Sequence, residues 1–155
     1  MNTQIKRNLL DHILLQNCHT AFFIGHEFNR QGDLPSLRGN LSISLSPHGN
    51  GVQQIAQVLT ECPQVHTVHI YTGGEPGKLI LGNVHLTADT IDQYAWDIQS
   101  WFGFIPSFIK PSLILDGCKF GDGEQGVALI HRLHHLTGSH ITCRQSSIRR
   151  HLQLV

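Results

Sequence analysis

The chain has 155 residues, and its eleven basic and eleven acidic side chains give a formal net charge of zero at neutral pH. With only 14% charged residues, it lacks the basic footprint of a nucleic-acid-binding protein, and no apolar run is long enough to span a membrane. The length is typical of one globular domain.

The four cysteines are widely spaced and form no Cys-x-x-Cys pair. This spacing argues against a zinc ribbon and favours reduced thiols in a cytoplasmic compartment. The N-terminal residues also lack the continuous apolar core of a signal peptide. We therefore expect a cytoplasmic protein with no cofactor and no resident metal.

The first predicted element is an amphipathic helix within residues 1–17, and residues 18–155 are predicted to form a single domain. A short buried strand is predicted at residues 20–25. After a polar loop, alternating apolar and polar residues predict a strand at 41–46. Apolar residues at helical spacing then predict a helix at 52–62.

A β-rich run at residues 65–72 predicts the next strand, and a β-hairpin is predicted around Gly82-Asn83. Thr87 has the side chain of a helix N-cap, so a helix is predicted over residues 88–101.

An apolar run at residues 112–118 predicts another core strand. The helix that follows is predicted at 123–136, because Asp122 and Gln125 stand at capping-box spacing and Gly138 suits a C-cap.

The last predicted strand covers residues 140–143. Strands that alternate with helices in this way favour an α/β fold with a mostly parallel sheet covered on both faces. Functional groups in such folds gather at the carboxyl ends of the strands.

Part of the chain resembles a known family, and the resemblance is carried by "HGNGVQQIAQVL", "VHTVHIYTGGEPGKLILGNVHLT", "LILDGC" and "GEQGVALIHRLHHLTGSHIT". From "LSISLS" to "HITC" the sequence resembles a bacterial domain of unknown function found near the start of giant surface proteins and adhesins. That domain is in turn similar to the caspase and gingipain group of cysteine peptidases. The resemblance implies a caspase-like three-layer α/β sandwich with a mostly parallel central sheet.

In those peptidases one core strand ends in a Ser-His-Gly-type motif and faces a strand that ends in Gly-Cys. The resemblance thus implies a dyad in which histidine is the base and cysteine the attacking thiolate. The nucleophile falls on Cys118, but the base falls on Gly73, and glycine cannot accept a proton. The cleft at these positions is one expected contact surface, formed by Thr72, Gly73, Gly74, Asp116 and Gly117.

Two alternatives remain open for the thiol. Cys118 is either a small apolar residue at the end of a core strand or a functional thiol whose pKa is lowered by the helix that follows. A histidine from elsewhere could also replace the missing base: His48 and His85 could fold inward, whereas His69 lies too far from position 73 along its own strand.

Two further motifs have alternative interpretations. "TGGEPG" (residues 72–77) is either a phosphate-cradling loop or a plain tight turn, and we expect the turn because no Lys-Ser/Thr pair follows. In "HRLHHL", His131 and His135 stand at i, i+4, a spacing used by metal sites. Since they point away from the apolar stripe, we expect a solvated face, with adventitious nickel or zinc binding as the alternative.

Six of the eleven aromatic residues fall within positions 94–108. They form either a thick hydrophobic cap over the sheet or an exposed contact patch for a protein partner or a second copy of the chain. The patch would be centred on Trp101, Phe102 and Phe104.

Two functions from different classes follow. The first is a pseudoenzyme: a non-catalytic, caspase-like binding or assembly module whose contact surfaces are the cleft and the aromatic segment. The second is an active cysteine hydrolase that uses Cys118 with a histidine from elsewhere. The missing base at Gly73 favours the first.

Overall fold

The computed structural model describes residues 18–26, 41–117 and 119–144. The predicted N-terminal helix and Cys118 lie outside this part of the chain. Its helices and strands, in chain order, are β1 (Thr20–Ile24), β2 (Leu41–Ser44), α2 (Gly51–Glu61), β3 (Thr67–Tyr71), β4 (Gly74–Glu75), β5 (Lys78–Leu81), β6 (Val84–Leu86), the 3₁₀ helix η3 (Ile91–Tyr94), α3 (Ala95–Gln99), β7 (Ser112–Asp116), α4 (Gly123–Thr137) and β8 (His140–Arg144).

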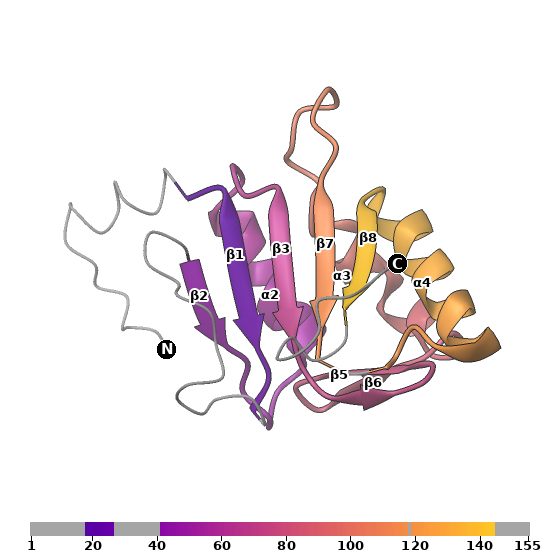
Figure 1. Ribbon diagram of the computed structural model, residues 1–155. Coiled ribbons are helices and arrows are strands. Elements are labelled where there is room, and N and C mark those ends of the chain that lie inside the picture. The colour runs from indigo at the N-terminus through magenta and orange to yellow at the C-terminus, as the bar shows by residue number, and fades with distance from the viewer. Residues whose placement is uncertain (1–17, 27–40, 118, 145–155) are drawn as a thin grey trace.

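Five strands of the described residues form one parallel sheet in the order β2-β1-β3-β7-β8 (Figure 1). Together with its helices this sheet makes a mixed α/β architecture, consistent with the predicted three-layer sandwich, and the predicted parallel sheet is confirmed. The α-helices of the described residues cover one face of the sheet (Figure 1). Strands β4, β5 and β6 form a small antiparallel sheet, which contains the predicted hairpin. No helix in the described ranges is both long and apolar enough to cross a membrane.

The connections explain where the helices lie. The crossovers from β2 to β3, from β3 to β7 and from β7 to β8 all move in the same direction across the sheet. Right-handed crossovers that move in the same direction place their helices on the same face. Helices α2, α3 and α4 accordingly lie together behind the sheet (Figure 1).

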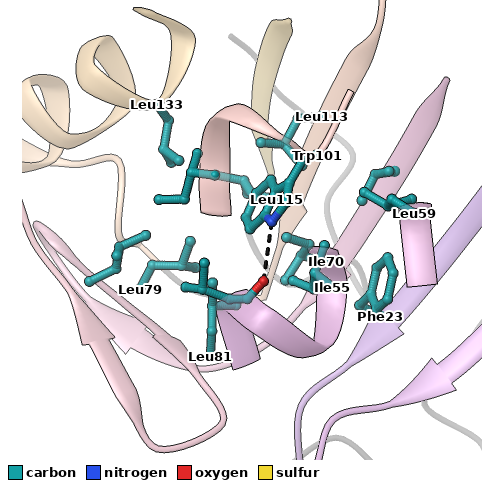
Figure 2. Close-up of a cluster of buried hydrophobic side chains, with 14 of the residues drawn as sticks. Phe23, Ile55, Leu59, Ile70, Leu79, Leu81, Trp101, Leu113, Leu115 and Leu133 are labelled. Atoms are coloured by element: carbon teal, nitrogen blue, oxygen red, sulfur yellow. Dashed lines mark hydrogen bonds between the residues drawn. The ribbon is translucent and has the colours of Figure 1, made fainter. Parts of the chain in front are cut away.

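The face of the sheet beneath these helices is apolar. Successive strand residues point to opposite faces, and every second residue of β1, β3 and β7 is fully buried: Ala21, Phe23, Val68, Ile70, Leu113 and Leu115. Val52, Ile55, Leu59, Leu129 and Leu133 pack against them from α2 and α4. Trp101 joins this core and its indole Nε1–H donates to the carbonyl oxygen of Val52 at 3.2 Å (Figure 2).

The opposite face of the same strands is more polar. It carries Thr67, His69 and Tyr71 from β3, Ser112, Ile114 and Asp116 from β7, and Thr142 and Arg144 from β8. These residues lie in register, so side chains from three strands meet in rows. The row nearest the carboxyl ends contains the charged pair that defines the candidate site.

The predicted helix at residues 88–101 is wrong in extent, because the chain forms only η3 and the short α3 there. Thr87 caps a first turn, as predicted: its Oγ1 accepts from the amides of Asp89 and Thr90, and Thr90 Oγ1 accepts from the amide of Thr87. These amides have no partner within a helix, so the hydroxyl groups satisfy them. The chain then continues as a turn and a 3₁₀ helix, and the α-helix begins only at Ala95.

The ends of α4 give one confirmed and one wrong prediction. Gly138 caps the C-terminus with φ 69°, and its amide donates to the carbonyl oxygen of His134. Asp122 is the N-cap residue, but its side chain makes no capping hydrogen bond, so the predicted capping box does not form. Its own amide instead donates to the carbonyl oxygen of Lys119 in the preceding turn.

Candidate functional site at the carboxyl edge of the sheet

Strands β3 and β7 end side by side. Tyr71 is paired with Asp116 in the parallel register, and the amide of Thr72 donates to the carbonyl oxygen of Asp116 at 3.2 Å. The amide of Gly117 donates to the carbonyl oxygen of Arg144 on β8. The Thr72-Gly73-Gly74 turn and the Asp116-Gly117 dipeptide therefore lie together at this edge, as predicted. Cys118 follows directly, outside the described residues.

The strand order has a switch point between β1 and β3, next to the ends of β3 and β7. From β1 the chain goes to β2 on one side, and it then returns to β3 on the other side of β1. Ligands of open α/β sheets bind at such a switch point, beyond the carboxyl ends of the strands. The amide of Gly25 after β1 donates to the carbonyl oxygen of Tyr71 at the end of β3, at 2.7 Å.

The backbone of the 72–77 turn is largely used by the fold. Thr72 is 1% exposed, and its hydroxyl donates to the carbonyl oxygen of Ile80 at 2.6 Å. The amide of Gly77 donates to the carbonyl oxygen of Phe120. A Cβ at Gly74 would come within 2.2 Å of the carbonyl oxygen of Lys78. These contacts favour the tight-turn interpretation over a phosphate cradle.

Two glycines of the edge differ in their conformational constraint. Gly117 has φ 125°, a conformation that other residues rarely adopt. Gly73 has no positive φ, and its carbonyl oxygen accepts from the amide of Ile80. The backbone thus requires glycine at 117, whereas at 73 its φ is compatible with a residue that has a side chain.

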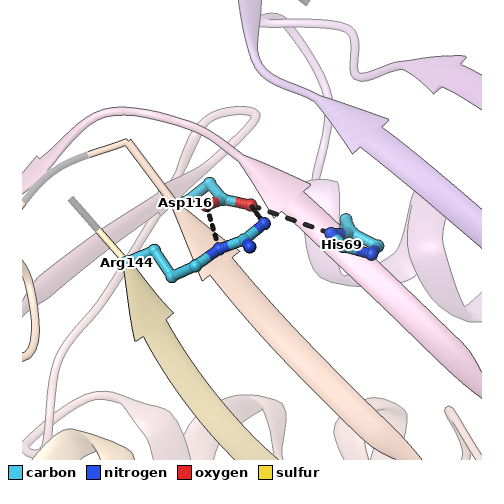
Figure 3. A network of polar contacts seen from close by, with 3 residues as sticks. All are labelled: His69, Asp116 and Arg144. Atoms are coloured by element: carbon cyan, nitrogen blue, oxygen red, sulfur yellow. Dashed lines mark hydrogen bonds and ion pairs between the residues drawn. The ribbon is translucent and has the colours of Figure 1, made fainter. Parts of the chain in front are cut away.

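Asp116 is the buried charge of the site. Its carboxylate is 1% exposed, and Arg144 on β8 binds it with both ends of the guanidinium fork (Figure 3). The distances are 2.9 Å from Nε to Oδ1 and 3.2 Å from Nη2 to Oδ2. This bidentate pair raises the pKa of Arg144. The carboxylate is therefore held as the partner of a cation.

His69 faces the same carboxylate. Its ring stacks on Phe22 with the centroids 4.4 Å apart, and its Nδ1 lies 3.8 Å from Asp116 Oδ2, beyond hydrogen-bond distance. Nδ1 is buried without a hydrogen-bond partner. Tyr71 is close by: burial raises its pKa first, and the negative charge of Asp116 raises it further. The site therefore holds one buried negative charge, the carboxylate of Asp116, between the guanidinium of Arg144 and the ring of His69.

Sequence reasoning missed Arg144 and did not predict that His69 lies near Asp116. The proximity of His69 to Asp116 follows from the sequence once the strand pairing is known. Once β3 and β7 are known to be parallel and in register, residues two apart on one strand share a face. The pairing of Tyr71 with Asp116 then places His69 on the face that carries the carboxylate.

The two histidines considered as substitute bases lie on other elements. His48 is exposed in the turn between β2 and α2, where its carbonyl oxygen accepts from the side-chain amide of Asn83. His85 is exposed on β6.

The aromatic segment divides into a core part and a surface part. Trp101 and Phe102 are 2% and 8% exposed and pack in the core, so the contact patch cannot be centred on them. Phe104 and Phe108 are 62% and 86% exposed. They belong to the loop between α3 and β7, which projects beyond the amino end of β7 (Figure 1). Trp96 on α3 is also exposed.

Comparison with known proteins yields one family. No curated protein and no solved structure matches the sequence significantly. Residues 35–149, more than half of the chain, match the domain of unknown function DUF4347. The match covers the elements from β2 to β8, including the turn after β3 and the end of β7. The chain therefore belongs to the DUF4347 family.

Proposed function

We propose that the chain is a non-catalytic relative of the caspase and gingipain cysteine peptidases that serves as a binding or assembly module. The observation that carries the proposal is Gly73 beside the Asp116-Gly117 dipeptide. The resemblance puts the general base at position 73, and a cysteine needs a base or another cause of a lowered pKa to act as a nucleophile.

The φ angle of Gly73 is not positive, so φ by itself does not demand glycine at this position. Asp116 does not replace the base, since its carboxylate is engaged by Arg144. The edge thus has no proton acceptor at the position where the resemblance puts the base.

The module has a second surface in Phe104 and Phe108. Exposed aromatic side chains on a projecting loop suit contact with a protein, because each buries a large apolar area when covered. We propose that a protein partner or a second copy of the chain covers this loop.

A second candidate function is a cysteine hydrolase, and one observation favours it. His69 has a buried, unpartnered Nδ1 on the face that carries Asp116, and Asp116 is two residues before Cys118. An imidazole close to a carboxylate is an arrangement that general bases use. His69 therefore joins His48 and His85 as a replacement to be tested.

The proposal is tested by restoring the missing base. The purified wild-type chain is expected to hydrolyse no substrate of a broad peptide and ester panel. In Gly73→His, Cys118 is expected to react with iodoacetamide at pH 7 at least tenfold faster than in the wild type, because a neighbouring imidazole increases the thiolate fraction. Gly73→Gln, which adds a side chain without a base, is the matched control and should leave the rate unchanged.

Peptide mass mapping locates the alkylated cysteine, and Cys118→Ala shows how much labelling belongs to this thiol. Wild-type turnover that disappears in Cys118→Ala would overturn the non-catalytic proposal. The variants His69→Phe, His48→Ala and His85→Ala would then identify the base that the hydrolase uses.

A further inference from the structure

Helix α4 carries a cluster of histidines outside the candidate site, and two of its polar side chains are already engaged. His134 Nδ1 lies 2.7 Å from the carbonyl oxygen of Ser139, so this histidine ties the end of α4 to the start of β8. Arg132 forms an ion pair with Asp92 of η3. His131 and His135 remain exposed on the helix surface.

We propose that His131 and His135 form a two-histidine chelate for a late first-row divalent ion: Cu²⁺, Ni²⁺ or Zn²⁺. The two residues are four apart, and their ring centroids lie 5.9 Å apart with 27° between the ring planes. Side chains at i and i+4 lie one above the other on a helix, and this is the spacing with which helical histidines bind zinc.

The backbone holds the pair in place. Both residues lie within Gly123–Thr137, a regular helix that ends at a left-handed glycine cap after His135. The helix therefore fixes the backbone positions of the two ligands, and binding has to order only their exposed side chains and not a loop. The cationic neighbour on the helix, Arg132, is paired with Asp92, which offsets its repulsion of a metal ion.

The surroundings leave the ion accessible. His131 also lines a surface hollow of about 590 Å³, together with Ala88, Glu124, Val127, Ala128 and Arg132. Within the described residues no group of three or more histidine, cysteine or acidic side chains could hold a metal. Two protein ligands leave the other coordination positions to water or to an external donor, so the ion exchanges readily and is not part of the folded core.

The chemistry of the ligands sets the order of affinity. Imidazole nitrogens suit copper, nickel and zinc, and affinity rises from Ni²⁺ to Cu²⁺ and falls again at Zn²⁺. Hard cations such as Mg²⁺ prefer oxygen ligands and are expected not to bind here. Because the ligating imidazoles must be neutral, binding is expected to weaken as the pH falls.

The test is a calorimetric titration of the untagged chain with NiCl₂, since Ni²⁺ does not oxidise the thiols of the protein. We expect one equivalent to bind the wild type and an affinity at least tenfold weaker for His131→Asn and for His135→Asn. His85→Asn removes an exposed histidine on β6 and should keep the wild-type affinity within twofold.

Thermal unfolding supplies a second readout and shows that the variants fold. Without metal, the three variants should unfold within a few degrees of the wild type, because the substituted side chains are exposed. Ni²⁺ at a concentration near the wild-type Kd should raise the wild-type Tm and the His85→Asn Tm more than the Tm of the other two variants. If His131→Asn or His135→Asn keeps the wild-type affinity, the chelate does not exist.

Discussion

At the scale of single residues, the most constrained group of the candidate site is Asp116. Its carboxylate is buried and its two oxygens bind the guanidinium of Arg144. Removing one partner of such a pair leaves a charge without compensation in a region of low dielectric constant. Losing Arg144 therefore destabilises the fold mainly because the Asp116 carboxylate is left buried without a cation.

The first prediction concerns this pair. Arg144→Met is expected to lower the free energy of unfolding by about 2 kcal/mol, because Asp116 then stays buried without its cation. Arg144 is half exposed, so the loss should fall below that of a fully buried pair. Urea denaturation at pH 7 measures the change.

The control for this prediction is a substitution of the neighbouring His69. His69→Phe removes a buried nitrogen that has no partner and preserves the stacking on Phe22, so it should be neutral or stabilising. Asp116→Asn combined with Arg144→Met should cost less than the sum of the two single changes. Additive losses would mean that the pair carries no coupling energy.

A second prediction belongs to Cys143 on β8. Burial, with smaller contributions from Asp122 and Asp116, raises the pKa of its thiol from 9.0 to about 11. Between pH 9 and about pH 11 the thiol therefore keeps its proton in the folded state and loses it in the unfolded state. Stability from this group is complete below pH 9 and is lost as the pH rises toward 11.

The stability difference between the wild type and Cys143→Ala should accordingly shrink by about 1–2 kcal/mol between pH 8 and pH 11. Using this difference between two proteins cancels the contribution of Tyr71, whose raised pKa acts in the same alkaline range. Urea unfolding at several pH values provides the measurement. A difference that stays constant with pH would contradict the burial of a protonated thiol.

At the scale of helices and strands, long periodic segments could be predicted and short ones could not. The strands that become β1, β3 and β7 are apolar runs, and α2 and α4 carry apolar residues at helical spacing, so burial alone favours those structures. Residues 88–101 show the limit of such patterns: Thr87 caps a first turn as predicted, but the chain then forms only η3 and the short α3. Asp122 shows the same limit: the residue type permits a cap, yet the turn before it decides the geometry.

At the scale of the whole molecule, sequence predicted the parallel sheet and the meeting of residues 72–74 with Asp116-Gly117. It did not predict the order of the strands or which side chains share a face of the sheet. The Asp116–Arg144 contact joins two strands whose register is set by tertiary pairing, and no local pattern marks it. Trp101 likewise bonds to Val52 across the core, so a cluster of aromatic residues in sequence does not show which of them reach solvent.

The last prediction separates the core aromatics from the surface aromatics. Phe104→Ser combined with Phe108→Ser should leave the free energy of unfolding within about 0.5 kcal/mol per substitution, because both side chains are mostly exposed. Trp101→Ala should lower it by about 3–5 kcal/mol, since the indole is buried and hydrogen-bonded. Thermal and urea unfolding distinguish these outcomes.

If a second copy covers the loop, sedimentation of the wild type at increasing concentration should show a dimer that the double variant does not form. If another protein covers it, the wild type stays monomeric. A partner protein captured by the wild type should then fail to bind the double variant. Two or three buried aromatic side chains contribute roughly 1.5–3 kcal/mol each, enough to anchor such a contact once the entropy of association is offset. A double variant that unfolds would place Phe104 and Phe108 in the core and remove the loop from the list of contact surfaces.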